Sequence, residues 1–220
     1  MALRSLKHHK LLVIIFPFIF ILSSCLGLSM DIVLNQNGSG TITLEYIISK
    51  QIDSLGKLDG NEQWNTIPIG KADFERTMDR LQDVKMVSFS SKEDEVNIMI
   101  NAKMEFESLQ GLIEFLDSGS RRSTLSGDGS QGRLLLTLAE AAESNNPLLD
   151  VLLRNISEPY SFNMSMSFPK EGSVNFINSQ GFSEVIPGAD IKSPGKVVSC
   201  SFPIYSILSS ERGIIAEFQW

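Results

Sequence analysis

Histidine is nearly absent from this chain. The only two, His8 and His9, lie within the first ten residues, so the chain from residue 25 onward has none. Catalytic systems of the Ser-His-Asp and Cys-His types are therefore excluded there, as are zinc and haem sites that depend on histidine ligands. We predict a protein that is not an enzyme and has no catalytic residues, metal or cofactor.

Basic residues are also scarce, with 19 Lys and Arg against 26 Asp and Glu. Three of the basic residues, Arg4, Lys7 and Lys10, precede the first hydrophobic run; without them 16 remain against 26, a formal charge of −10. This balance argues against binding nucleic acid or an anionic lipid surface through bulk charge. A soluble, aggregation-resistant surface is the simpler interpretation.

The first hydrophobic run is short. Leu11 to Leu22 is uncharged and follows a basic segment without acids, but it falls short of the roughly 20 residues that a spanning helix needs. A basic region, a short apolar region and small residues after it are the parts of a secretory signal peptide. An N-terminal membrane anchor that is never cleaved is the alternative.

The four residues that end this region, Leu22-Ser23-Ser24-Cys25, resemble the lipobox of bacterial lipoproteins. The resemblance implies lipid, such as palmitate, on the Cys25 thiol, cleavage after Ser24 and acylation of the new amino group. More than one acyl chain makes a stable anchor. We therefore predict a lipoprotein signal peptide over residues 1–24. We predict a single extracytoplasmic domain over residues 25–220, held at the inner or outer membrane of the cell envelope through Cys25.

Lipid on Cys25 would leave Cys200 without an intramolecular partner, because these are the only two cysteines. An exported domain without a disulfide must depend on its hydrophobic core. Cys200 lies in the strand-like run Val197 to Phe202. We predict a buried, unreactive thiol there, with a reactive thiol as the alternative.

Strand patterns dominate the remaining sequence. Met30 to Gln36 and Thr41 to Ser49 flank Asn37-Gly38-Ser39-Gly40, which predicts a hairpin. Alternation places Ile32 and Leu34 on one face, and Ile42, Leu44, Tyr46 and Ile48 on another. Further strands are predicted at 85–90, 95–104, 123–126, 133–138, 160–168, 174–177, 196–202 and 214–220.

Three segments have helical patterns. Asp73 to Val84, with Asp73 as N-cap, has an apolar stripe of Phe74, Met78 and Leu81; Ser108 to Asp117 has Leu109, Leu112, Ile113 and Leu116. Asn146-Pro147 begins the third, which ends near Glu158. Between the first two strands and the first helix, residues 51–70 are predicted as a loop in which Trp64 packs into the core or is exposed. The 160–168 strand needs an apolar cover, which the helices provide. The predicted fold class is α+β, a mainly antiparallel sheet with about three amphipathic helices packed on it.

Three patterns in the sequence resemble parts of functional sites. The glycine-rich segment Gly127 to Gly132 has neither the ending of a P-loop nor enough acids for a calcium loop, and it is predicted to be a turn. The acids Glu140, Glu143, Asp150 and Glu158 are not placed opposite one another by spacing. Methionines on strands and helices are predicted to fill the core, although an apolar pocket is the alternative.

The mature start, with Asp31-Ile32-Val33-Leu34 and Asn37-Gly38-Ser39-Gly40-Thr41, resembles the LppM-domain lipoproteins, as does the ending Gly213 to Trp220. That resemblance implies an α+β extracytoplasmic domain without catalytic residues; lipid binding has been proposed for some members. The predicted function is non-catalytic binding or scaffolding in the envelope, with envelope proteins or lipid as partners and no nucleic acid. A carrier of lipid or another apolar ligand is the first alternative, and a carboxylate-based hydrolase is the second.

Overall fold

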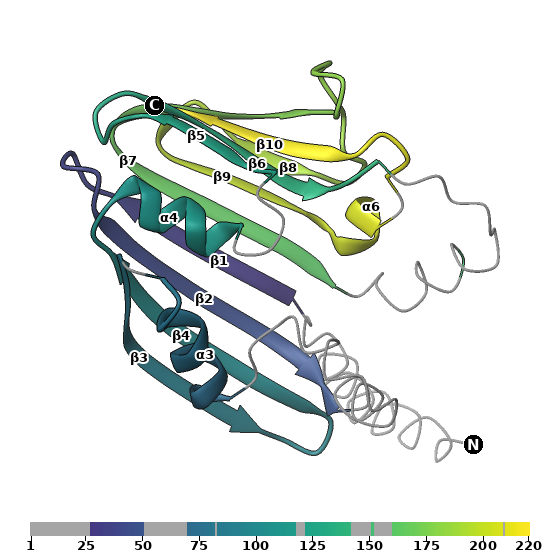
Figure 1. The fold of residues 1–220 in the computed structure, drawn as a ribbon. Helices are drawn as coiled ribbons and strands as arrows, with labels where there is room; N and C mark the ends of the chain where they lie inside the picture. The colour runs from purple at the N-terminus through teal and green to yellow at the C-terminus, as the bar shows by residue number, and fades with distance from the viewer. Residues whose placement is uncertain are drawn as a thin grey trace, which may run out of the picture.

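The computed structural model describes residues 27–50, 70–81, 83–117, 122–141, 151, 160–208 and 210–220. Within these residues it has ten strands and three helices, an α+β fold as predicted (Figure 1). The predicted signal peptide and Cys25 lie outside the described residues, as do the predicted loop with Trp64 and the predicted helix from Asn146 except for Gly70 and Val151. None of the described helices is long and apolar enough to cross a bilayer.

The strands are β1 (Gly27–Leu34), β2 (Gly40–Ser49), β3 (Val84–Glu93), β4 (Asn97–Phe106), β5 (Thr124–Gly127), β6 (Gly132–Ala139), β7 (Ser161–Ile177), β8 (Asp190–Lys192), β9 (Gly195–Pro203) and β10 (Ile214–Gln219). The helices are α3 (Lys71–Met78), α4 (Leu109–Leu116) and α6 (Ile204–Leu208). Hydrogen-bonded neighbours follow the order β3-β4-β2-β1-β7-β10-β6-β5, and β9 pairs with both β7 and β8. The sheet is mainly antiparallel, as predicted, although β1 and β7 run parallel.

The predicted first hairpin is confirmed. β1 and β2 pair antiparallel with Ile32 opposite Ile42, and the Asn37 side chain accepts a hydrogen bond from the Ser39 backbone N–H at 3.2 Å in the turn. The prediction that the apolar residues of the two strands lie on different faces was wrong. Directly paired residues point to the same side of a sheet, so both sets enter one core.

Strand β7 differs most from its prediction. Residues 160–168 and 174–177 were predicted as separate strands, yet one strand runs from Ser161 to Ile177. Its first part pairs with β1 and β9, and its last part pairs with β10. The change of partners occurs around Gly172, where the ladder with β9 is irregular. The strand therefore bends instead of ending.

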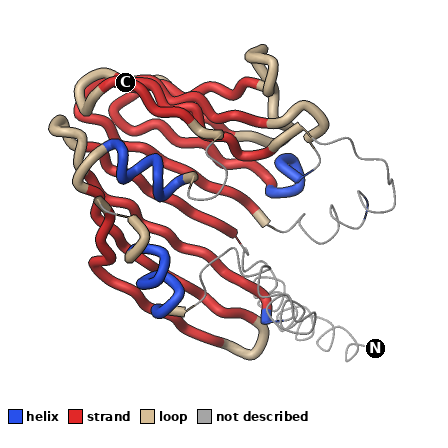
Figure 2. The backbone as a smooth tube through the Cα atoms, viewed as in Figure 1, coloured by secondary structure: helices blue, strands red, loops and turns tan. Residues whose placement is uncertain are grey.

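This bend folds the sheet into two layers. In Figure 1, β5, β6 and β10 form an upper layer. Both α4 and α3 lie on one face of the lower strands, α4 next to the upper layer and α3 in front of β4. The tube in Figure 2 shows that helices occupy little of the domain compared with strands. The Phe176 ring, on the last part of β7 that pairs with β10, meets the Phe202 ring of β9 edge-on, with centroids 5.5 Å apart. The two layers therefore share one apolar core.

The predicted alternation of β7 is confirmed by burial. Phe162, Met164, Met166 and Phe168 are all buried, while the serines and asparagine between them are half-buried. Met104 of β4 is buried as well. These methionines therefore fill the core, as predicted, whereas Met99 is partly exposed.

The first helix is shorter than predicted. It begins after Gly70, which is the N-cap, and Asp73 occupies the third helical position instead. The Asp73 carboxylate accepts a hydrogen bond from the Gly70 N–H at 3.1 Å, so it caps the helix from inside. Val84 was predicted to end the helix but begins β3, opposite Phe106.

The second helix is confirmed as α4. Its predicted start is the N-cap Ser108, whose hydroxyl accepts a hydrogen bond from the Gly111 N–H at 3.1 Å. Leu112 of the predicted stripe is fully buried. Two short elements had no prediction, α6 and β8, because segments of five and three residues are too brief to show a periodic pattern.

Replacing Met164 tests whether this face is a closed core. We expect Met164→Ala to lower the free energy of unfolding by about 2–5 kcal/mol, because a large buried side chain leaves a cavity. Met99→Ala is the matched control, since Met99 is 36% exposed and its truncation should change stability by less than about 0.5 kcal/mol. The measurement is denaturant unfolding followed by circular dichroism. Equal, small losses for both variants would contradict a closed core at Met164.

Replacing Gly172 tests the bend. A β-carbon there would lie 2.4 Å from the Phe168 ring and 2.9 Å from the Gln219 carbonyl oxygen. The Phe168 ring is stacked on Trp220, with centroids 5.3 Å apart, and has little room to move. We expect Gly172→Ala to cost about 1–3 kcal/mol of stability, as overpacking does. Gly195, the partner of Gly172 in the ladder, is the control, because its nearest contact would be 3.3 Å away. A loss at Gly172 no greater than at Gly195 would refute this account of the bend.

Candidate binding groove

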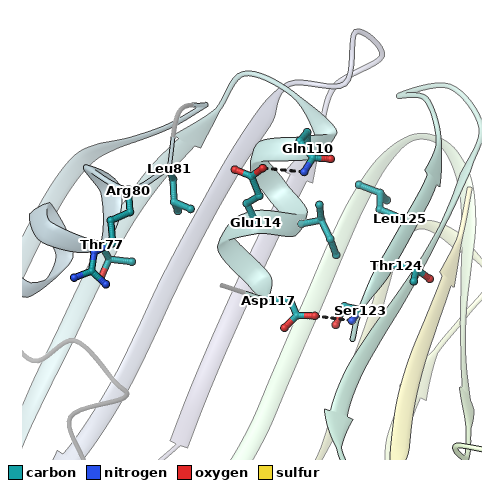
Figure 3. Close-up of a pocket in the computed structure, with 10 residues that line it drawn as sticks. Thr77, Arg80, Leu81, Gln110, Glu114, Asp117, Ser123, Thr124 and Leu125 are labelled. Carbon is teal, nitrogen blue, oxygen red and sulfur yellow. Dashed lines mark hydrogen bonds between the residues drawn. The ribbon is translucent and has the colours of Figure 1, made fainter. Parts of the chain in front are cut away.

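A groove lies between α3, α4 and β5. It has a volume of about 980 Å³, and its lining comes from the end of α3, the exposed face of α4 and the start of β5 (Figure 3). The lining residues are Thr77, Arg80, Leu81, Gln110, Ile113, Glu114, Asp117, Ser123, Thr124 and Leu125. We call this the α4 groove.

The α4 groove has an apolar component. Leu81, Ile113 and Leu125 are partly buried and pack against the main core, and each comes from a different segment. They contribute apolar surface that is attached to the rigid part of the domain. An occupant with apolar side chains would bury this surface on binding.

Polar side chains surround the apolar component. The Gln110 amide donates a hydrogen bond to Glu114 Oε1 at 2.8 Å, along one side of α4. The Asp117 carboxylate accepts from the Ser123 backbone N–H at 2.5 Å, which ties the end of α4 to β5. Glu114 and Asp117 point in different directions in Figure 3. They therefore do not form a facing pair of acids across the groove.

One residue, Asp83, fixes the start of α4, which forms one wall of the groove. It lies directly before β3, its carboxylate accepts a hydrogen bond from the Ser108 hydroxyl, and its carbonyl oxygen accepts from the Glu107 N–H at 2.8 Å. A β-carbon on Gly111 would lie 2.7 Å from the Asp83 β-carbon, so only glycine allows α4 to approach this closely. The position of α4 is therefore set by backbone contact.

The opposite face of the sheet is mainly polar, although Val33, Met99 and Val197 are exposed on it. Two hollows lie on this face: one of about 440 Å³ across β1 to β4 and the start of β7, and one of about 200 Å³ across β1, β7, β8 and β9. Ser201 donates a hydrogen bond to Asn163 at 2.6 Å, and Asn101 donates to Glu45 at 2.6 Å, so the polar groups pair along rows. An antiparallel sheet with one face in water has this composition, and these pairings explain the face without a ligand.

The glycine-rich segment is the turn between β5 and β6, as predicted. Asp128 Oδ1 accepts hydrogen bonds from the N–H groups of Ser130 and Gln131 and from the Ser130 hydroxyl. These bonds, first of all those from Ser130, lower the pKa of the Asp128 carboxyl. The Trp220 indole N–H donates to the Asp128 carbonyl oxygen at 2.9 Å. The carboxylate is thus occupied by its own turn.

The remaining candidates have simple roles where they are described. Cys200 is 2% exposed, and burial raises the pKa of its thiol to about 12, which fits the predicted unreactive thiol. Glu140 pairs with Arg122 at the surface. Glu143, Asp150, Glu158 and Cys25 lie outside the described residues, so their assignments stay predictions.

The sequence did not predict the α4 groove. Leu81, Ile113 and Leu116 were assigned to helical stripes, but no pattern indicated that α3, α4 and β5 would leave space between them. The groove depends on where three segments end relative to one another. Local periodicity contains no such information.

Comparisons with known proteins give one structural similarity. Neither the protein-family models nor the curated proteins contain a match. The fold is similar to the NMR structure of the folded domain of the Mycobacterium tuberculosis LppM protein, with a TM-score of 0.45 and 12% sequence identity over 89% of this chain and 88% of that chain. A similarity at this level assigns no function.

Proposed function

We propose that this chain is a lipoprotein of the bacterial cell envelope whose domain is a non-catalytic binding or scaffolding module. The observation that carries the proposal is the mixed lining of the α4 groove. Its apolar residues pack against the core, Gln110 and Asp117 have hydrogen-bond partners within the protein, and its acids do not face each other. Such a surface suits recognition of a segment of another envelope protein better than it suits chemistry.

The membrane attachment in this proposal comes from Leu22-Ser23-Ser24-Cys25. Strand β1 begins at Gly27, two residues after the proposed lipid site. Lipid on Cys25 would therefore hold the domain through a strand that is paired on both sides, with β2 and with β7. A short connection of this kind keeps the domain close to the bilayer.

A carrier of an apolar ligand is the second candidate. The volume of the α4 groove, about 980 Å³, is at the upper end of the range of small-molecule sites. However, only three of the lining residues named above are apolar, and the methionines that might have lined a lipid cavity are buried in the core. The balance of the lining favours a protein segment over an acyl chain.

Replacing the lipid-bearing cysteine tests the anchoring. We expect Cys25→Ala to abolish metabolic labelling with a fatty acid and to leave the signal peptide uncleaved by the lipoprotein route, because the thiol is the attachment atom. Cys200→Ala is the matched control and should label as wild type does. Label retained in Cys25→Ala would reject Cys25 as the site.

Site-specific photo-cross-linking tests the groove. A photoreactive residue at position 110, on the exposed face of α4, should give a discrete protein adduct in intact cells. The same residue at position 103, exposed on the opposite face of the sheet, should not. A lipid adduct at position 110, identified by mass spectrometry, would favour the carrier. Equal adducts at both positions would contradict a role for the groove.

A further inference from the structure

One end of the domain contains the start of β1. Gly27 lies beside Ser161, the first residue of β7, and Ser161 lies beside Pro203, the last residue of β9. We call this the β1-start end. Any lipid on Cys25 would be two residues from it.

The upper layer returns to this same end. Phe176 contacts Phe202, and Phe202 pairs with Phe162 near the start of β7. The last residues of β7 therefore lie over its first residues, and the segment 178–189 that follows leaves the domain at the β1-start end. The Ser206 hydroxyl, in α6 directly after β9, donates a hydrogen bond to the Pro187 carbonyl oxygen at 3.1 Å and holds the segment there.

The segment 178–189 is tightly organised at its base. The Asn178 side chain is 3% exposed, and its Oδ1 accepts hydrogen bonds from the N–H groups of Gln180 and Phe182, both at 3.0 Å. The Glu184 N–H donates to the Phe176 carbonyl oxygen at 2.9 Å. Although the backbone is fixed by these bonds, two large apolar side chains on it point away from the core.

These two side chains are Phe182, which is 67% exposed, and Val185, which is 85% exposed. They are the most exposed large apolar side chains in the part of the chain that the structure describes. Holding apolar side chains in water does not stabilise a soluble domain, because the transfer of apolar surface out of water is what is favourable. A surface that excludes water at this end would explain both residues.

We propose that Phe182 and Val185 insert into the bilayer surface beside the lipid on Cys25, so that the membrane contacts the domain at two places. The inference rests on the proposed anchoring at Cys25. The formal charge of −10 after residue 24 disfavours attraction to anionic headgroups. The contact is therefore apolar and should persist at high salt, unlike a contact through basic residues.

Fluorescence of a single labelled cysteine in the full, acylated chain tests this contact. Val185→Cys is purified from a bacterial envelope, coupled to an environment-sensitive fluorophore, and reconstituted in phosphatidylethanolamine and phosphatidylglycerol vesicles that contain spin-labelled lipid. Acylation blocks Cys25, and burial protects Cys200, so the wild-type chain should take up no label. Val197→Cys is the matched control, because Val197 is 58% exposed and lies at the other end of β9.

We expect blue-shifted emission and several-fold stronger quenching by spin-labelled lipid at position 185 than at position 197. This difference in quenching should be unchanged in about 1 M salt, which screens surface charge. Equal quenching at the two positions, in protein that floats with the vesicles, would overturn the inference and leave the anchoring intact. Wild-type protein that does not float with vesicles would refute the anchoring, and the inference would fall with it. Flotation therefore distinguishes the two failures.

Discussion

The structure depends on the shared pairing of β7. This strand has β1 and β9 on its two sides at the start and β10 at its end. Both layers are thus hydrogen-bonded to one continuous backbone, and the core between them closes only because that backbone bends near Gly172. Phe162 and Phe176, on the two parts of the strand, each meet the Phe202 ring, at 5.2 and 5.5 Å. The bend therefore brings the core together as well as connecting the layers.

Alternating apolar residues predicted the strands well because their physical cause is local. Each side chain of β7 and β9 faces either the core or water, and a strict period of two follows from strand geometry. The bend in β7 could not be predicted in the same way. Pro169 to Gly172 contains residues typical of turns, and only the pairing with distant strands, β9 before this stretch and β10 after it, makes it part of one strand.

Helix boundaries show the same division between local and distant causes. The start of the second helix was predicted at Ser108, and the hydroxyl of this residue caps the helix through a bond three residues ahead, within the same segment. Asp73 was misplaced because an acid at the third position can cap a helix as well as one at the N-cap. Val84 was assigned to the helix from local spacing, but it pairs with Phe106, a residue more than twenty positions away, and therefore begins a strand. The α4 groove, which three such boundaries define, was beyond local reasoning for the same reason.

The α4 groove and the β1-start end lie at different parts of the domain, which bears on how an anchored module would work. Val84 pairs with Phe106, Phe106 pairs with Gly40, and Gly40 pairs with Leu34, the last residue of β1. Because Asp83 fixes α4 beside Val84, the start of α4 lies near the end of β1, and the eight residues of β1 separate it from Gly27 by about 25 Å along the strand. A domain held to the bilayer at Gly27 would therefore present the start of α4 away from the lipid. A partner could reach that part of the groove from the aqueous side without displacing the membrane contact.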